Sequence, residues 1–383
     1  MSWGGVPGWR SIASGAAIVL LGAGLLGGAF ILSGLYNVAA SSNHFDITNF
    51  IIRLTLARSV ETRSMGIEPP PDLSDERLAR LGARHFALGC APCHASPSTS
   101  QNPIAAKMYP APPPLSHAAE EWDAEELFWI VKHGLKFTGM PAWPALERDE
   151  EVWALVAFLE RLPEMEGRDY AEFSGTGGER SASALTFAPD RALEETVEMC
   201  GSCHGDARNP PVHPLAPPLA GQKEAYLRRA LSEYAAGRRP SGIMEPMAAA
   251  LGPSQIEAVA QHYARASLSP PGTSVDADAD AAARGQAIAM NGLGEDGIPA
   301  CRSCHAAETS GQFPRLDGLP AEYIATQLSL FQSGVRAGSA YSAIMAPIAR
   351  RLSKEQIEDV AAYFAARSPG DGTGDTAGSE ASQ

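Results

Sequence analysis

The sequence predicts an all-α protein in which one membrane-spanning helix precedes three tandem helical units. Three observations support this prediction. The N-terminal region contains a long stretch without charge, one five-residue motif occurs three times at intervals of roughly a hundred residues, and apolar residues recur with helical periodicity. No stretch shows a convincing alternating pattern of a β-strand. A chain of 383 residues has room for two or three domains.

The N-terminal stretch has no charged side chain between Arg10 and His44. Its segment from Ile12 to Leu35 is long enough to cross a bilayer and too long for the apolar part of an ordinary signal peptide. Because Arg10 precedes this segment, we expect the N-terminus to stay in the cytoplasm and the remaining chain to be translocated. A cleaved signal peptide is the alternative, since residues 38–40 resemble a cleavage site.

A second apolar run follows the predicted anchor. Phe50, Ile51 and Leu54 lie close to Arg53 and Arg58, which predicts an amphipathic helix over residues 45–64. Such a helix lies against the membrane or a partner, or it packs on the first helical unit. Three consecutive prolines, residues 69–71, then interrupt the chain.

The repeated motif is Cys-x-x-Cys-His, and its three copies use all six cysteines of the chain. The copies lie at Cys90, Cys93 and His94, at Cys200, Cys203 and His204, and at Cys301, Cys304 and His305. This motif is typical of c-type haem attachment, in which two thiols bind the porphyrin and the histidine ligates the iron. The sequence therefore predicts three covalently attached haem c groups.

Other interpretations of the cysteines fit less well. A redox dithiol of the thioredoxin type belongs to a βαβ context, and this chain shows no alternation of strands and helices. A zinc site needs ligand pairs closer together than these motifs, and three pairs cannot all form closed four-cysteine sites. Structural disulfides do not require a histidine after every second cysteine.

The second and third units are repeats of each other, and the repeat predicts their axial methionines. Ile243-Met244-Glu245-Pro246 matches Ile344-Met345-Ala346-Pro347. Met244 and Met345 each lie 40 residues after the histidine of their motif. Met247 falls opposite Ile348, which predicts a core residue beside the haem. A methionine ligand raises the potential and closes the iron to substrates, whereas a second histidine lowers the potential.

In the first unit, Met140 is the predicted sixth ligand. It follows His94 by 46 residues, whereas Met108 follows it by only 14 and is expected to be too close to reach the opposite haem face. His133 is the rival ligand, although its place on a predicted helix suggests a partly exposed side chain. The predicted iron ligands are therefore His94 with Met140, His204 with Met244, and His305 with Met345.

Helix signals frame each motif. Ser74 is the expected N-cap of a helix that runs through Leu88 toward the first motif, and a closing helix is expected from Asp149 to Leu162. The closing helices of the other units are expected to start at Pro253 and after Ser353, where Gln356 completes a capping box.

These features resemble the class I c-type cytochrome family. Gly82 and Phe86 before Cys90 match its Gly-x-x-x-aromatic-x-x-x-Cys pattern, and Gly285 matches it less closely. The first unit resembles monohaem modules through Gly-Met-Pro-Ala-Trp at residues 139–143, and the other two resemble tandem diheme cytochromes. The resemblance implies three tandem class I cytochrome c domains after the N-terminal transmembrane helix.

The expected organisation follows from the units and their boundaries. It comprises a membrane anchor (residues 1–40), a membrane-proximal segment (41–72), cytochrome c domain 1 (73–163), a linker (164–188), domain 2 (189–268), a linker (269–281), domain 3 (282–367) and a disordered tail (368–383).

The resemblance also implies contacts around each haem. The carbonyl groups of Pro113, Pro217 and Pro314 are expected to accept a hydrogen bond from the axial histidines. Arg239 and Arg336 are expected either to contact haem propionates or to be solvated surface arginines.

Charge and haem chemistry together indicate function. The net charge of −14 argues against nucleic acid and anionic lipid surfaces as partners, and it suits a basic protein face. The leading hypothesis is a periplasmic electron carrier, held in the bacterial inner membrane by one helix, that feeds a terminal oxidase. Its expected partners are redox proteins: a terminal oxidase, a quinol–cytochrome c reductase, a soluble cytochrome or a dehydrogenase subunit. The alternative is the cytochrome subunit of an alcohol, aldehyde or sugar dehydrogenase, and a third hypothesis is a dihaem peroxidase, which needs an open haem.

Overall fold

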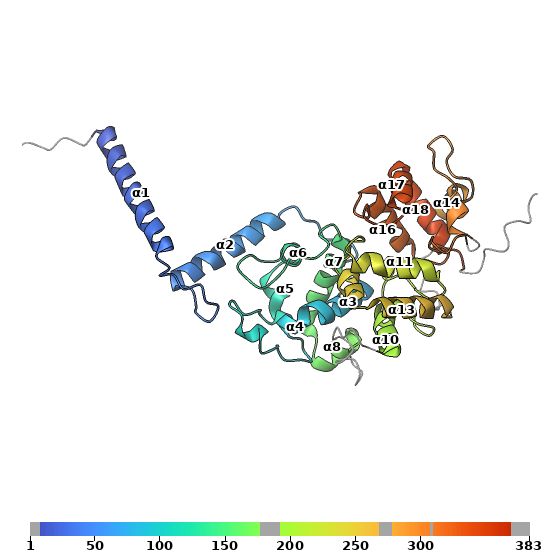
Figure 1. Cartoon of the computed structure of the whole chain (residues 1–383), viewed down its shortest axis with the longest axis horizontal. Coiled ribbons are helices and arrows are strands. Elements are labelled where there is room, and N and C mark those ends of the chain that lie inside the picture. Colours follow the sequence, from blue (N-terminus) through green and yellow to red (C-terminus); the bar gives the residue numbers. More distant parts are fainter. Residues whose placement is uncertain (1–7, 177–191, 268–277, 307–308, 369–383) are drawn as a thin grey trace, which may run out of the picture.

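The computed structural model describes residues 8–176, 192–267, 278–306 and 309–368. Within these ranges the chain is helical and contains no strand, only two isolated β-bridges. The all-α prediction is confirmed. Figure 1 shows one helix standing apart from a helical body, with the first unit nearer that helix and the second and third units side by side at the far end. The predicted disordered tail lies almost entirely outside the described residues.

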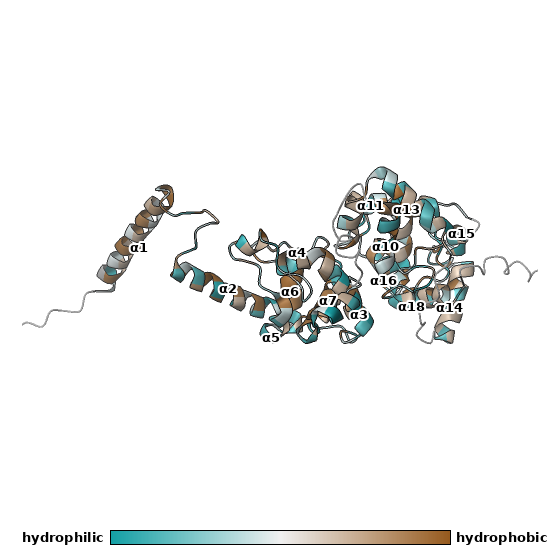
Figure 2. Ribbon diagram, turned by 90° about the horizontal axis from the view of Figure 1, so that it is seen from below, coloured by the Kyte–Doolittle hydropathy of each residue, from teal (hydrophilic) through white to brown (hydrophobic). Residues whose placement is uncertain are grey.

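The isolated helix is α1, Trp9–Leu32. Its stretch from Ile12 to Leu32 is long and apolar enough to cross a membrane, and none of it is buried against the rest of the chain. Figure 2 shows the apolar character along its length. The helix confirms the predicted apolar segment and ends three residues before the expected Leu35.

Helix α2, Asp46–Ser64, connects α1 to the first unit and has two different surroundings. Its C-terminal part packs on α6, Ala124–His133, and buries Val60. Its N-terminal part leaves five large apolar side chains exposed, namely Phe45, Ile47, Phe50, Ile51 and Leu54. The packing on the first unit is confirmed for the C-terminal part, and the contact of the N-terminal part with a membrane or a partner stays a prediction.

The first unit starts with a helix that delivers the first motif. Its elements are α3 (Glu76–His85), a π-helical turn (Phe86–Cys90), α4 (Ala91–His94), 3₁₀ turns at Ala105–Lys107 and Leu115–His117, α5 (Ala118–Glu121), α6, α7 (Asp149–Leu159), a 3₁₀ turn at Leu162–Glu164 and α8 (Gly167–Phe173). The expected cap Ser74 is wrong: the N-cap is Asp75, whose carboxylate accepts from the Arg77 N–H at 2.8 Å. Neighbouring Ser and Asp cap equally well, so sequence cannot choose between them. The expected continuous helix through Leu88 is also wrong, because α3 passes into the π-helical turn at Phe86.

Helix α8 lies in the stretch expected to be a linker. Its Tyr170 is buried, and its ring lies 6.2 Å from that of Phe86 and 6.1 Å from that of Phe158. These aromatic contacts attach residues 167–173 to the core of the first unit. The rest of that expected linker, from residue 177, lies outside the described residues.

The second and third units repeat one order of helices. The second contains α10 (Leu193–His204), α11 (Glu224–Ala235), α12 (Met244–Ala249) and α13 (Pro253–Arg265), and the third contains α14 (Ala279–Asn291), α15 (Arg302–His305), α16 (Ala321–Gln332), α17 (Ser342–Arg351) and α18 (Lys354–Ala365). Figure 1 shows α11 of the second unit next to α16 of the third. In both units the predicted methionine lies on the penultimate helix.

In each outer unit, the helix before the motif crosses the helix predicted to close the unit at a glycine. A Cβ on Gly82 of α3 would lie 1.8 Å from the carbonyl oxygen of Ala154 on α7, and one on Gly285 of α14 would lie 1.9 Å from that of Asp359 on α18. Only glycine permits backbones to approach this closely. The two glycines that carried the family pattern are therefore packing positions.

The capping box predicted for the last helix is present. Ser353 Oγ accepts from the Gln356 N–H at 3.1 Å, and Gln356 Oε1 accepts from the Ser353 N–H at 2.9 Å. We expect Ser353→Ala to lower the free energy of unfolding of the third unit by about 1 kcal/mol. The measurement is thermal unfolding with Ser329→Ala, an exposed serine within α16, as the control. Equal midpoints for both variants would contradict the role of the cap.

Candidate haem sites

Each motif histidine is held in the same way. Its Nδ1–H donates to a proline carbonyl oxygen, from His94 to Pro113 at 2.8 Å, from His204 to Pro217 at 2.7 Å and from His305 to Pro314 at 2.9 Å. Because a carbonyl only accepts, Nδ1 carries the proton and Nε2 keeps a lone pair for a metal. The contacts implied by the family resemblance are present in all three units.

The electrostatic surroundings favour neutral imidazoles in the second and third units. Burial lowers the pKa of His204 and of His305, and it outweighs the opposing effect of the proline carbonyls. Neutral imidazole is the form that ligates iron.

The cysteines do not have the character of a redox dithiol. All six are thiols rather than disulfides in the described residues. Burial raises the pKa of the Cys90 thiol to about 12 and that of the Cys301 thiol to about 11. Reactive dithiols instead have a lowered pKa. A buried, uncharged thiol beside an oriented histidine suits covalent attachment of a porphyrin.

A cavity beside the second motif is walled by all three units. Cys200, Cys203 and His204 line it together with Met244. The first unit contributes Leu81, His85 and Leu88, and the third contributes Leu319, Tyr323 and Gln327. The lining is mostly apolar, as a porphyrin face requires, and the thiols, the imidazole and a thioether all reach it. These residues fit a haem attached to the second motif.

The structure places the predicted methionines as follows. Met244 is the first residue of α12, Met247 lies one turn later, and both line the cavity. Met345 lies within α17 and packs against the core of the third unit. All three side chains are half-buried.

In the first unit Met140 lies in the turn between α6 and α7, where its N–H donates to Thr138 Oγ1 at 3.0 Å. Met108, which was expected to be too close to His94 to reach the opposite haem face, also lies at this turn. Its Cε occupies the place beside Gly139, 1.9 Å from where a Cβ would lie. His133 is exposed.

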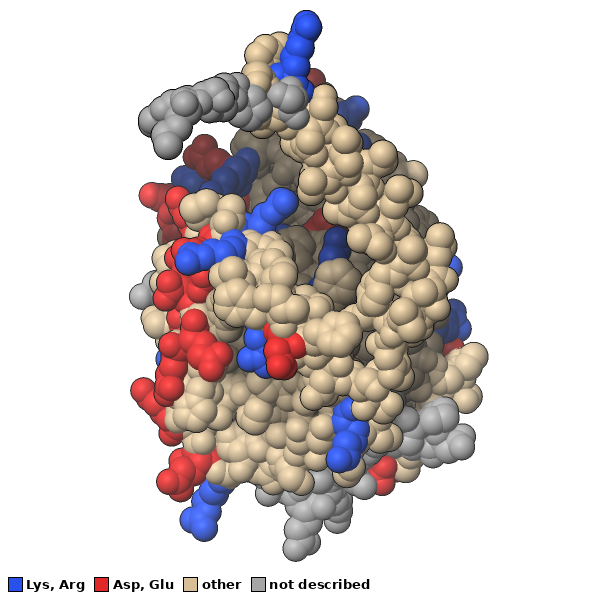
Figure 3. Space-filling view, turned by 90° about the vertical axis from the view of Figure 1, so that its left-hand side faces the viewer, with Lys and Arg blue, Asp and Glu red and all other residues tan. Residues whose placement is uncertain are grey.

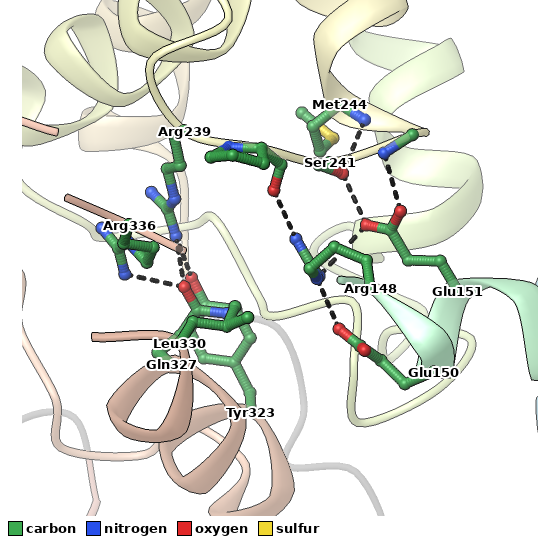
Figure 4. Close-up of polar contacts among 12 residues, drawn as sticks. Arg148, Glu150, Glu151, Arg239, Ser241, Met244, Tyr323, Gln327, Leu330 and Arg336 are labelled. Carbon is green, nitrogen blue, oxygen red and sulfur yellow. Dashed lines mark hydrogen bonds and ion pairs between the residues drawn. The ribbon is translucent and has the colours of Figure 1, made fainter. Parts of the chain in front are cut away.

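Two buried arginines lie between the second and third units. The alternative that they are solvated surface residues is therefore wrong. Arg239 is 2% exposed and Arg336 is 7% exposed. Arg239 Nη2 donates to Tyr323 Oη and to Gln327 Oε1, both at 2.9 Å, and Arg336 Nη1 donates to the same Gln327 oxygen at 2.7 Å. Figure 4 shows this shared acceptor.

The two guanidinium groups still need a negative partner. The Nε atoms of Arg239 and Arg336 are buried and have no hydrogen-bond partner in the described part of the chain. Burial, followed by repulsion from Arg239, lowers the pKa of Arg336 to about 10. Two buried cations that share only neutral partners suit the carboxylates that a haem carries.

Sequence reasoning missed the contacts that join the histidine-orienting loops. The Gln222 side chain donates to the Arg315 carbonyl at 3.0 Å and accepts from the Arg315 N–H at 2.7 Å. Arg315 follows Pro314 directly, so the loops that hold His204 and His305 brace each other. No local pattern signals a contact between residues 93 positions apart.

A second missed feature anchors the third motif. The buried carboxylate of Asp317 lies 3.4 Å from Arg302, inside the motif, and 3.1 Å from Arg367 after the last helix. The aspartate thus ties the motif to the end of the unit.

The first and second units meet through an apolar contact near Cys203. Leu78, Leu81 and Ala157 pack with Ala216, and Leu215 and Cys203 lie against the same cluster. The first unit therefore covers part of the second motif.

Comparison with known proteins gives the family of this chain. The family model "Cytochrome C oxidase, cbb3-type, subunit III" matches residues 77–159, and the model "Cytochrome c" matches residues 282–367. Cytochrome c4 of Stutzerimonas stutzeri is 34% identical over 185 residues, which are 44% of this chain and 84% of that protein. The thiosulfate dehydrogenase electron acceptor of Stutzerimonas stutzeri strain A1501 is 33% identical over 169 residues, 43% of this chain and 77% of that protein.

Among solved structures, reduced recombinant cytochrome c4 from Pseudomonas stutzeri is 31% identical, with a TM-score of 0.40. The match covers 46% of this chain and 97% of the cytochrome c4 chain. The matched relatives and both family models are cytochromes c, proteins that bind haem c covalently and transfer electrons to redox partners. The three Cys-x-x-Cys-His motifs share the same histidine–proline contact and lie on an all-α scaffold, which agrees with this match. The chain belongs to the class I cytochrome c family.

Proposed function

We propose that this protein is a membrane-anchored electron carrier with three haem c groups, acting in a respiratory chain toward a terminal oxidase. The observation that carries the proposal is the histidine–proline pair repeated in three units that share buried interfaces. The proposed ligand pairs are His94 with Met140, His204 with Met244, and His305 with Met345. When bound, each haem supplies an iron that alternates between the ferric and ferrous states.

The residues of the chain supply orientation and burial. The proline carbonyls fix the tautomer and the plane of each imidazole. The proposed methionines would hold the iron as its second protein ligand, which would favour electron transfer over substrate binding. Arg239 and Arg336 hold positive charge at the boundary of the second and third units, where it offsets the negative charge of haem carboxylates.

The direction toward an oxidase is supported by the first unit. Residues 77–159 match a family model whose description names subunit III of a cbb3-type cytochrome c oxidase. Figure 3 shows Asp and Glu side chains gathered along one edge of the face that looks toward α1. With a net charge of −14, this surface suits a partner that presents basic residues.

The proposed location is the periplasmic side of the inner membrane. Helix α1 is exposed along its whole apolar length, and the exposed apolar end of α2 follows it directly. An anchor and an interfacial helix in series would hold the haem units close to membrane complexes. Cleavage after residues 38–40 would instead release them.

A second candidate function is electron acceptor or cytochrome subunit of a dehydrogenase. Two relatives, 33% and 35% identical, carry the name thiosulfate dehydrogenase electron acceptor. The electron donor would then be a separate catalytic subunit. It would oxidise thiosulfate or, in the hypothesis drawn from the sequence, an alcohol, aldehyde or sugar.

The experiment that separates these functions is purification of the native complex in mild detergent. We expect copurification with a haem–copper oxidase and reduction of that oxidase by the pre-reduced carrier. Copurification with a flavin or quinone-cofactor dehydrogenase, and reduction by its substrate, would contradict the leading proposal.

The number of haems is tested separately. We expect iron analysis and the pyridine haemochrome spectrum to give three haems per chain, and Cys200→Ala with Cys203→Ala to give two. Ser202→Ala, inside the same motif, is the control and keeps three. Two haems per chain in the unsubstituted protein would contradict the proposal that all three motifs bind haem.

A further inference from the structure

A buried carboxylate of the first unit reaches into the second unit. Glu151 of α7 is 7% exposed. Its Oε1 accepts from the Ser241 hydroxyl at 2.6 Å, and its Oε2 accepts from the Gly242 N–H at 2.7 Å. Figure 4 shows both bonds, which end on the segment that leads into α12. One side chain of the first unit thus fixes two consecutive residues of the second.

The contact continues to the proposed iron ligand. Ser241 Oγ also accepts from the Met244 N–H at 3.0 Å. Two hydrogen bonds therefore connect the Glu151 carboxylate to the backbone of Met244, the first residue of α12 (Figure 4). Because a thioether must lie at bonding distance from iron, the position of this backbone decides whether the ligand reaches it.

The same segment is confined sterically. A Cβ on Gly242 would lie 2.2 Å from the ring of Trp143 in the first unit. The Trp143 indole N–H donates to Glu151 Oε2 at 3.1 Å. The indole and the carboxylate therefore hold the Gly242 backbone from two sides.

Arg148 completes this cluster. It is buried, pairs with Glu151 Oε1 at 3.1 Å, and donates from Nη1 to the Pro240 carbonyl at 2.9 Å. The carboxylate thus has an arginine, an indole, a hydroxyl and an amide as partners. A buried ion pair contributes little net stability compared with apolar packing, so stability alone does not explain this cluster.

The arrangement recurs one unit further along the chain. Glu233 of α11 is 2% exposed, and its Oε1 accepts from the Ala340 N–H at 2.8 Å. Ala340 lies just before α17, which carries Met345. Arg229 lies 3.6 Å from the Glu233 carboxylate, as Arg148 lies near Glu151. In the first unit, by contrast, the N–H of Met140 is bound by Thr138 of its own turn.

We infer that Glu151 and Glu233 are positioning residues, each of which holds the methionine segment of the next unit at its iron. Unit one then controls the sixth ligand of unit two, and unit two controls that of unit three. The inference rests on the proposed ligation by Met244 and Met345.

The test measures ligand loss at each haem of the full-length protein in detergent. The ferric protein is mixed with cyanide, which binds only after the methionine has left the iron. The methionine methyl resonances of the reduced protein identify each haem, and Met140→Ala, Met244→Ala and Met345→Ala assign them.

We expect Glu151→Ala to raise the rate of cyanide binding at the second haem by about tenfold, since hydrogen bonds to a charged group are lost. Glu233→Ala is expected to do the same at the third haem only. The matched controls keep the unsubstituted rates: Glu160→Gln, exposed at the C-terminal end of α7, and Glu257→Gln, on the surface of the second unit.

The milder variants Glu151→Gln and Ser241→Ala keep the test decisive if Glu151→Ala fails to fold, and both are expected to show an intermediate rate. Unchanged rates at the second haem, with its methionine resonance intact, would overturn the inference. Equal acceleration at all three haems would overturn it as well, because it would indicate general destabilisation. If the unsubstituted protein lacks the Met244 resonance, the proposed ligation itself fails, and that outcome is distinct from the other two.

Discussion

Replacing Met244 by alanine is expected to remove about one third of the far-red absorption band that methionine ligation gives to the ferric protein. The second haem should then bind cyanide at once, and its potential should fall. Met247→Ala is the control, because Met247 lines the same cavity one helical turn later. It is expected to keep the full band, since the repeat places Met244 opposite Met345.

Two further comparisons extend this experiment. Met345→Ala should remove another third of the band, and Ile348→Ala should leave it unchanged. In the first unit the decisive pair is Met140→Ala against Met108→Ala, because both side chains lie at the same turn. Loss of the band in Met247→Ala or Met108→Ala, with retention in Met244→Ala or Met140→Ala, would show that the ligands have been assigned to the wrong methionines.

Gly285→Val is expected to destabilise the third unit severely. The new Cβ would lie 1.9 Å from the Asp359 carbonyl oxygen and 2.9 Å from Tyr363 Cβ. Neither α14 nor α18 can shift freely, since both pack in the same core. Overpacking of this kind costs about 3 kcal/mol, and a backbone clash places this site at or above that value. The midpoint of the matching thermal transition should fall by more than about 10 °C.

Gly82→Val in the first unit is the parallel case, because its Cβ would lie 1.8 Å from the Ala154 carbonyl oxygen. Gly294→Ala is the control, since a Cβ there meets nothing within 4 Å and its backbone is not left-handed. Differential scanning calorimetry of the haem-loaded protein resolves the transitions. A midpoint for Gly285→Val equal to that of Gly294→Ala would contradict the tight crossing.

The sequence predicted features that depend on local chemistry. Apolar periodicity gave the helices, Ser353 with Gln356 gave a cap, and the family pattern gave the proline contacts of the three histidines. Boundaries were less secure, because adjacent residues such as Ser74 and Asp75 offer the same capping oxygen. The expected end of α7 at Leu162 was three residues late, because the helix ends at Leu159 and a separate 3₁₀ turn starts at Leu162.

Contacts between units were beyond prediction. Glu151 has the sequence appearance of an acidic residue in the first turn of a helix, where the dipole alone explains it. Its partners, Ser241 and Gly242, lie 90 residues away or more and have no pattern of their own. Arg239 likewise resembles a surface residue until the third unit covers it. Periodicity describes one helix, whereas burial at an interface depends on its neighbour.

The walls of the cavity beside Cys200 and Cys203 have a consequence for biogenesis. Leu81 and His85 line it from the first unit, and Leu319 and Tyr323 line it from the third. A porphyrin has to reach these thiols while both neighbouring units are still open. We therefore expect the middle haem to be attached before the flanking units dock, since earlier docking would restrict access to these thiols.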